Sequence, residues 1–130
     1  MKRTAAAATA IALAAASALP AIGAGDALDG RSFEGVFIER GKTSGDSDTL
    51  MFRDGRFRSV ACDRYGYSDA PYRADSTGDV IRFEAETQSP KYGKLLWSGV
   101  VRAGKLDATA IMVREGKSHI ENWIVAAEKR

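Results

Sequence analysis

Histidine and cysteine are nearly absent from this chain of 130 residues, which holds one of each, His119 and Cys62. Metal clusters and nucleophile–histidine pairs need several such side chains, so this scarcity argues against most metal sites and most catalytic sites. A lone cysteine also excludes a disulfide within the chain, so the fold must rely on apolar packing and backbone hydrogen bonds. We therefore expect no metal and no cofactor.

The longest apolar run lies at the N-terminus. Two basic residues precede an Ala-rich stretch over residues 5–19, which ends in a proline and small residues up to Ala24. This order is typical of a secretory signal peptide, and the stretch is weaker than the roughly 20 strongly apolar residues of a membrane span. We therefore expect cleavage after Ala24, a periplasmic or secreted protein without membrane insertion, and a single domain over residues 25–130.

A surplus of positive charge is also missing. The chain carries 19 Lys and Arg against 17 Asp and Glu, and the two bases within residues 1–24 account for the whole difference. Nucleic acids attract proteins through a surplus of positive charge. We therefore expect no nucleic-acid partner.

Alternation of apolar and polar side chains recurs along the rest of the chain, and no helical period persists for three turns. Ile81, Phe83 and Ala85 alternate with charged residues, which predicts a strand with one buried face. Asp54 and Gly55 separate two such runs and are typical of a tight hairpin turn. Eight strands are predicted in all, over residues 33–40, 50–53, 56–60, 70–74, 80–87, 94–103, 105–114 and 118–127.

The predicted fold is all-β. Consecutive strands joined by short turns are usually neighbours in space, and eight of them can close into an antiparallel up-and-down barrel. The linkers around residues 41–47 and 62–69 are long enough to cross between sheets. A two-layer β-sandwich is therefore the alternative.

The first predicted strand carries a motif, Phe33-Glu-Gly-Val-Phe-Ile-Glu39, with an aromatic residue on either side of a glycine and Phe37 as the second one. This motif resembles the start of the first strand in calycins, the lipocalin and avidin-like group of small exported barrels that hold ligands. The resemblance covers this strand alone. It implies the barrel architecture.

Four aromatic residues are candidates for lining a ligand site inside the barrel: Trp97, Trp123, Phe37 and Phe83. Inward aromatic side chains can line a pocket for an apolar or aromatic ligand, or they can fill a small barrel solidly. Both alternatives remain open at this point. The leading functional prediction is an exported barrel that binds a small apolar or aromatic ligand.

A second candidate site is the loop over residues 62–73. It contains Arg64, Tyr65, Tyr67, Tyr72 and Arg73, residue types that recur in protein recognition surfaces. The alternative function is therefore an envelope protein that binds or inhibits another macromolecule, such as a lysozyme or a protease, through this loop. A tyrosine-containing turn with its hydroxyls in water is the plainer interpretation.

Cys62 and His119 are the residues on which any chemistry would depend. Cys62 is either a buried, inert side chain or a redox-active thiol, so we expect a monomer or a dimer linked through Cys62. His119 shares a predicted strand face with Glu121, and such a pair can transfer protons. Because no motif places a nucleophile beside His119, we expect no enzymatic activity.

Overall fold

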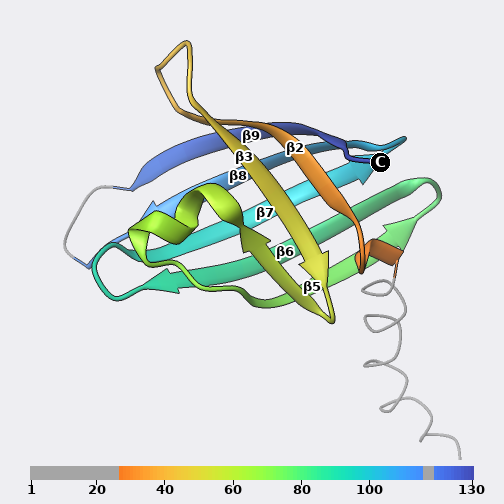
Figure 1. Cartoon of the computed structure of the whole chain (residues 1–130), viewed down its shortest axis with the longest axis horizontal. Coiled ribbons are helices and arrows are strands. Elements are labelled where there is room, and N and C mark those ends of the chain that lie inside the picture. The colour runs from red at the N-terminus through yellow and green to blue at the C-terminus, as the bar shows by residue number, and fades with distance from the viewer. Residues whose placement is uncertain (1–26, 116–118) are drawn as a thin grey trace, which may run out of the picture.

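Eight antiparallel strands form a closed barrel in the order of the sequence (Figure 1). This computed structural model describes residues 27–115 and 119–130. The predicted up-and-down barrel is confirmed, while the predicted signal peptide over residues 1–24 lies outside the described residues, as does the first position expected for the last strand. The strands are β2 (Ser32–Glu39), β3 (Asp46–Arg53), β4 (Arg56–Ser59), β5 (Ala70–Thr77), β6 (Val80–Ser89), β7 (Gly93–Arg102), β8 (Lys105–Val113) and β9 (Ile120–Glu128).

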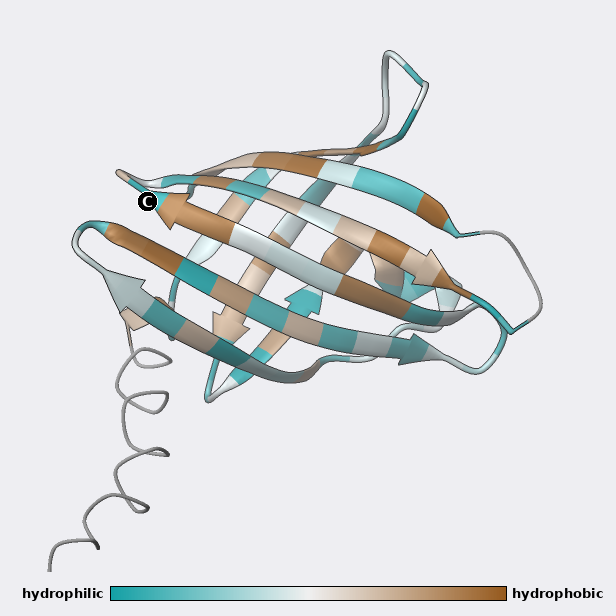
Figure 2. Ribbon diagram, turned by 180° about the vertical axis from the view of Figure 1, so that it is seen from behind, coloured by the Kyte–Doolittle hydropathy of each residue, from teal (hydrophilic) through white to brown (hydrophobic). Residues whose placement is uncertain are grey.

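Alternation along the strands separates the core from the outer surface, as the change of hydropathy colour from residue to residue along much of β6 illustrates (Figure 2). Phe52 and Phe57 are at most 1% exposed, whereas the arginines that neighbour them in β3 and β4 are exposed. The turn between these strands has positive φ angles at both Asp54 (52°) and Gly55 (76°), as the predicted hairpin requires. Phe52 lies at the centre of the core, with its ring centroid within 5.0–6.0 Å of the rings of Phe33, Phe57, Tyr72 and Phe83.

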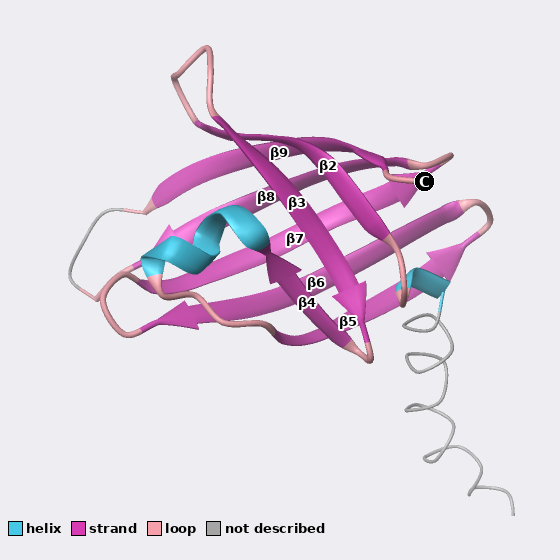
Figure 3. Ribbon diagram, in the orientation of Figure 1, coloured by secondary structure: helices cyan, strands magenta, loops and turns pink. Residues whose placement is uncertain are grey.

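One end of the barrel carries a short 3-10 helix, η1 (Val60–Tyr65), between β4 and β5 (Figure 3). The helix ends at Gly66, whose φ of 86° is left-handed and whose N–H donates to the carbonyl oxygen of Asp63. Below it, Asp48 accepts hydrogen bonds from the Ser59 hydroxyl at 2.6 Å and from the Ala61 N–H at 2.9 Å. These bonds attach η1 to the inner face of β3.

The segment before β2 covers the opposite end. Leu28 is fully buried there, and Asp29 accepts hydrogen bonds from the Gly55 N–H at 3.1 Å and from the Tyr72 hydroxyl. Arg31 donates two parallel hydrogen bonds, both 3.0 Å long, to the carboxylate of Glu128 at the end of β9. Within the described residues, no helix is long and apolar enough to cross a bilayer.

Candidate functional site

The interior of the barrel is filled around Trp97. Its indole N–H donates to the Thr87 hydroxyl at 2.9 Å, and its ring contacts Phe57 and Phe37 at centroid distances of 4.8 and 6.0 Å. A hollow interior would leave its lining accessible to water-sized molecules, yet Trp97 and Phe83 are each only 2% exposed. Of the two alternatives for Trp97, core packing is therefore the one found.

Trp123 lies on the outer face of the barrel, 48% exposed, beside Val125, which is 57% exposed. The residues of β9 that point inward are Asn122, Ile124 and Ala126, all buried. Apolar side chains occupy both faces of this strand, so alternation alone could not assign its inward face. The prediction that Trp123 lines the interior is wrong.

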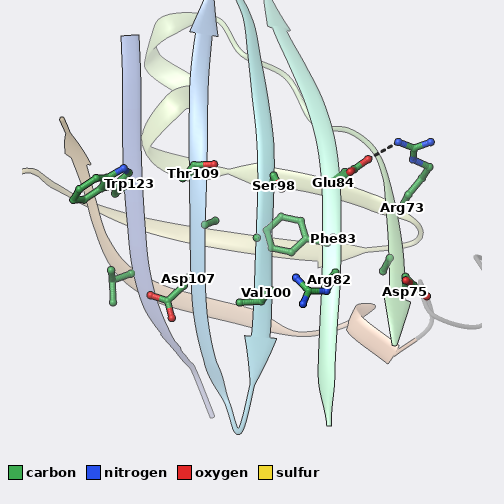
Figure 4. Close-up of a pocket in the computed structure, with 14 residues that line it drawn as sticks. Arg73, Asp75, Arg82, Phe83, Glu84, Ser98, Val100, Asp107, Thr109 and Trp123 are labelled. Atoms are coloured by element: carbon green, nitrogen blue, oxygen red, sulfur yellow. Dashed lines mark hydrogen bonds and ion pairs between the residues drawn. The ribbon is translucent and has the colours of Figure 1, made fainter. Parts of the chain in front are cut away.

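Trp123 borders a hollow of about 870 Å³ on the outer surface of β5 to β9, which we call the outer hollow (Figure 4). Thr109 and Ser98 form its floor, and Glu84 and Arg73 form the side opposite Trp123. These five residues are successive cross-strand partners along one row of the sheet. The outer hollow therefore results from short side chains in the middle of the row and long ones at its two ends.

Gly99 keeps the floor of the outer hollow close to the core. It is the cross-strand partner of Phe83 on one side and of Ala108 on the other. A Cβ atom at this position would lie 2.8 Å from Cε1 of Phe83 and 2.6 Å from Cβ of Ala108, closer than real Cβ atoms come to other atoms. A glycine in mid-strand therefore lets β7 approach the Phe83 ring.

The outer hollow contains both paired and unpaired charges. Arg73 and Glu84 form an ion pair at its edge, drawn as a dashed line in Figure 4. Arg82, Asp75 and Asp107 also line it, and within residues 27–115 and 119–130 no ion pair or side-chain hydrogen bond holds them. These three groups are available to a ligand.

A second hollow of about 590 Å³ adjoins the first and shares Arg73, Glu84, Ser98 and Thr109 with it. Its remaining lining includes the outward side chain of Leu96. The two hollows therefore lie next to each other on the outer face.

The predicted recognition loop is only partly exposed. Tyr65 is 42% exposed, and the centroid of its ring lies 5.7 Å from that of Tyr92. The Arg64 guanidinium lies 5.1 Å from the centroid of the Tyr65 ring. Tyr67 and Tyr72 are buried at 6% and 9% exposure, so the prediction that they form a binding edge is wrong.

The local direction of the backbone explains why Tyr67 and Tyr72 are buried. The left-handed Gly66 turns the chain from η1 into the barrel, so that Tyr67 enters the core. On β5 the outward positions belong to the neighbours of Tyr72, one of which is Arg73. Arg73 thus belongs to the outer hollow and not to the surface around Tyr65.

Cys62 is buried within η1, 6% exposed. Burial raises the pKa of its thiol to about 11, and the negative charges of Asp48 and Asp63 act in the same direction. The nearby guanidinium of Arg64, whose positive charge would favour the thiolate, contacts Asp46 at 3.4 Å. A buried, protonated thiol is a poor nucleophile, so the geometry favours the inert alternative for Cys62.

His119 is exposed next to the start of β9. Glu121, its expected partner, accepts hydrogen bonds from Arg40 and from the Trp123 indole N–H, and the Arg40 bond lowers the pKa of its carboxyl. Among the described residues, no group of three or more His, Cys, Asp or Glu side chains is placed to hold a metal ion.

Comparison with known proteins leaves the chain without an assigned family: no protein-family model, no curated protein and no solved structure matches it. The barrel is the architecture that the calycin resemblance implied. Sequence reasoning missed Ser98, Thr109, Arg82 and Asp107 as site residues. The available signal was Gly99, a glycine within an otherwise regular strand.

Proposed function

We propose that this chain is an exported binding protein that holds its ligand on the outside of the barrel, in the outer hollow. The observation that carries the proposal is Trp123, a large aromatic side chain left half exposed at the edge of a hollow of about 870 Å³. Exposed aromatic surface beside a concave site usually marks a place of interaction. The unpaired Arg82, Asp75 and Asp107 supply polar groups that can orient a ligand there.

Export is part of the proposal and rests on the N-terminal sequence. The basic start, the Ala-rich run and the small residues up to Ala24 have the order of a signal peptide. The protein isolated from its own host should therefore have the mass of residues 25–130. A mass that includes residues 1–24 would contradict this part of the proposal.

A second candidate function is capture of a protein partner by the exposed surface around Tyr65. The observation that favours it is a pair of aromatic rings covered by cations, with Arg64 next to Tyr65 and Lys91 Nζ 5.4 Å from the centroid of Tyr92. Tyrosine and arginine are the residue types that dominate protein-interface energetics. Only this part of the predicted loop supports the alternative function.

Native mass spectrometry of the protein, isolated from its host envelope, separates the two functions. In the Ser98→Arg variant a long side chain occupies the floor of the outer hollow, and Tyr65→Ala removes the exposed ring at η1. Thr77→Arg, at an exposed position of β5 outside the lining, is the matched control.

We expect a non-covalent adduct that is lost in Ser98→Arg and retained in Tyr65→Ala and Thr77→Arg. An adduct lost only in Tyr65→Ala would favour the second function. An adduct retained in all three variants, or no adduct on any of them, would contradict the outer hollow as the ligand site.

A further inference from the structure

We infer that the ligand of the outer hollow is a neutral glycan chain, an inference that rests on the function proposed above. The first argument is the presentation of Trp123. Its indole N–H is held by Glu121 at 3.4 Å, and the residue is nevertheless 48% exposed. A sugar ring has one face of C–H groups, which packs favourably against an exposed indole ring.

The second argument is the mixture of polar groups beside the indole. The hydroxyls on the rim of a sugar are donors and acceptors at once, and they need both kinds of partner when bound. Asp107 and Asp75 accept hydrogen bonds, Arg82 donates them, and the Ser98 and Thr109 hydroxyls do both. Apolar ligands would leave these groups without partners.

The balance of charge narrows the class of glycan. Two positive side chains, Arg73 and Arg82, face three negative ones, Asp75, Glu84 and Asp107. A polyanionic chain would meet more repulsion than attraction in the outer hollow, and a polycation would leave the unpaired Arg82 facing a like charge. A neutral chain fits this lining best.

The closed sheet argues against an extended peptide in the same place. Peptides that bind to sheets usually join an open edge through backbone hydrogen bonds. The sheet closes through the pairing of β2 with β9, and the two strands of the floor, β7 and β8, pair with a neighbour along both edges. The floor of the outer hollow therefore offers side chains but no unpaired strand edge.

The length of the outer hollow points to several sugar units. From Trp123 on β9 to Arg73 on β5 the row of outward side chains crosses four strand-to-strand steps. At about 4.8 Å per step this is roughly 19 Å. An oligosaccharide should therefore bind more tightly than its monosaccharide.

NMR of the whole protein can test the glycan with named probes. The indole N–H of Trp123 reports on the outer hollow, and that of Trp97, buried and bonded to Thr87, is the internal control. The neutral probes are chitotetraose and cellotetraose, compared with N-acetylglucosamine, tetra-alanine and the apolar dye N-phenyl-naphthylamine. The amide signals of Ser98 and Thr109 follow binding in variants that lack the reporter.

We expect at least one tetrasaccharide to shift the Trp123 signal saturably and to leave the Trp97 signal in place. Trp123→Ala should weaken this binding by about tenfold or more, as loss of an aromatic anchor does. Ser98→Arg should abolish it, and Thr77→Arg should leave it unchanged. The position of the Trp97 signal shows that each variant remains folded.

Two kinds of result would overturn the glycan. If neither tetrasaccharide moves Trp123 while the dye or tetra-alanine does so in a manner abolished by Ser98→Arg, the ligand class is wrong and the outer hollow remains a binding site. If a tetrasaccharide binds equally well to Ser98→Arg, it binds elsewhere. Failure of the proposed function itself is recognised separately, by a native adduct that Ser98→Arg retains.

Discussion

Replacement of Gly99 by alanine tests the close approach of β7 to the core. The new Cβ would lie 2.6 Å from Cβ of Ala108, 2.7 Å from the backbone oxygen of Asp107 and 2.8 Å from Cε1 of Phe83. None of these neighbours is the free end of a flexible side chain, so the two strands and the ring must move together. Overpacking of this kind costs about 1–3 kcal/mol, and the reduced freedom of the unfolded chain offsets about 0.4–1 kcal/mol of that cost.

We therefore expect Gly99→Ala to lower the free energy of unfolding by about 1–2 kcal/mol. Urea denaturation gives the value from a shift in midpoint at unchanged slope. Ser98→Ala, one position away and facing outward, should change stability by no more than about 0.5 kcal/mol. Adding Ala108→Gly to Gly99→Ala should restore part of the loss, because it removes the 2.6 Å contact. A Gly99→Ala variant as stable as the wild type would refute the close approach.

Three further predictions concern the core. Trp97→Phe removes the donor to the buried Thr87 hydroxyl and leaves a void, so we expect urea denaturation to show a free energy of unfolding lower by about 2–4 kcal/mol. A decrease below about 0.5 kcal/mol would indicate a hollow interior. With a pKa of about 11, Cys62 should react with iodoacetamide near pH 8 at least about a hundredfold more slowly in the native protein than in urea, and equal rates would contradict its burial. Burial raises the pKa of Asp48 above 3.8. The free energy of unfolding of the wild type minus that of Asp48→Asn should therefore fall as pH rises from about 3.8 through the folded-state pKa. If this difference rises with pH instead, the pKa of Asp48 is lowered and the prediction is wrong.

The strands were predictable because their alternation is regular where one face is wet. From Ile81 to Glu86 in β6, the apolar residues, among them Phe83, and the charged residues lie on opposite faces. The Asp54-Gly55 pair fixed the register of β3 and β4 through its left-handed backbone. Every predicted strand that lies within the described residues is present.

The candidate site was less predictable because its determinants are not local. On β9 both faces are apolar, and the outward position of Trp123 is set by pairing with β2 and β8, where it lies opposite Ile38 and Thr109. Similarly, the inward turn at Gly66 depends on η1, a helix too short to leave a periodic signal in the sequence. The outer hollow is formed by residues from five strands, and no segment of the chain contains it.

The ladder between β4 and β5 is the weakest link in the ring of strands. It holds only two residue pairs, Arg56 with Pro71 and Phe57 with Ala70, and proline has no N–H to donate. By contrast, β6 pairs with β7 over its whole length. Because the β4–β5 ladder is the weakest contact in the ring, we expect the barrel to open there first. Strands β2, β3 and β4 would then move away together, still attached through the pairing of β2 with β9. Faster amide hydrogen exchange in β4 than in β6 would record that opening. Because the outer hollow lies across β5 to β9, the proposed ligand site would remain assembled while β4 and β5 are apart.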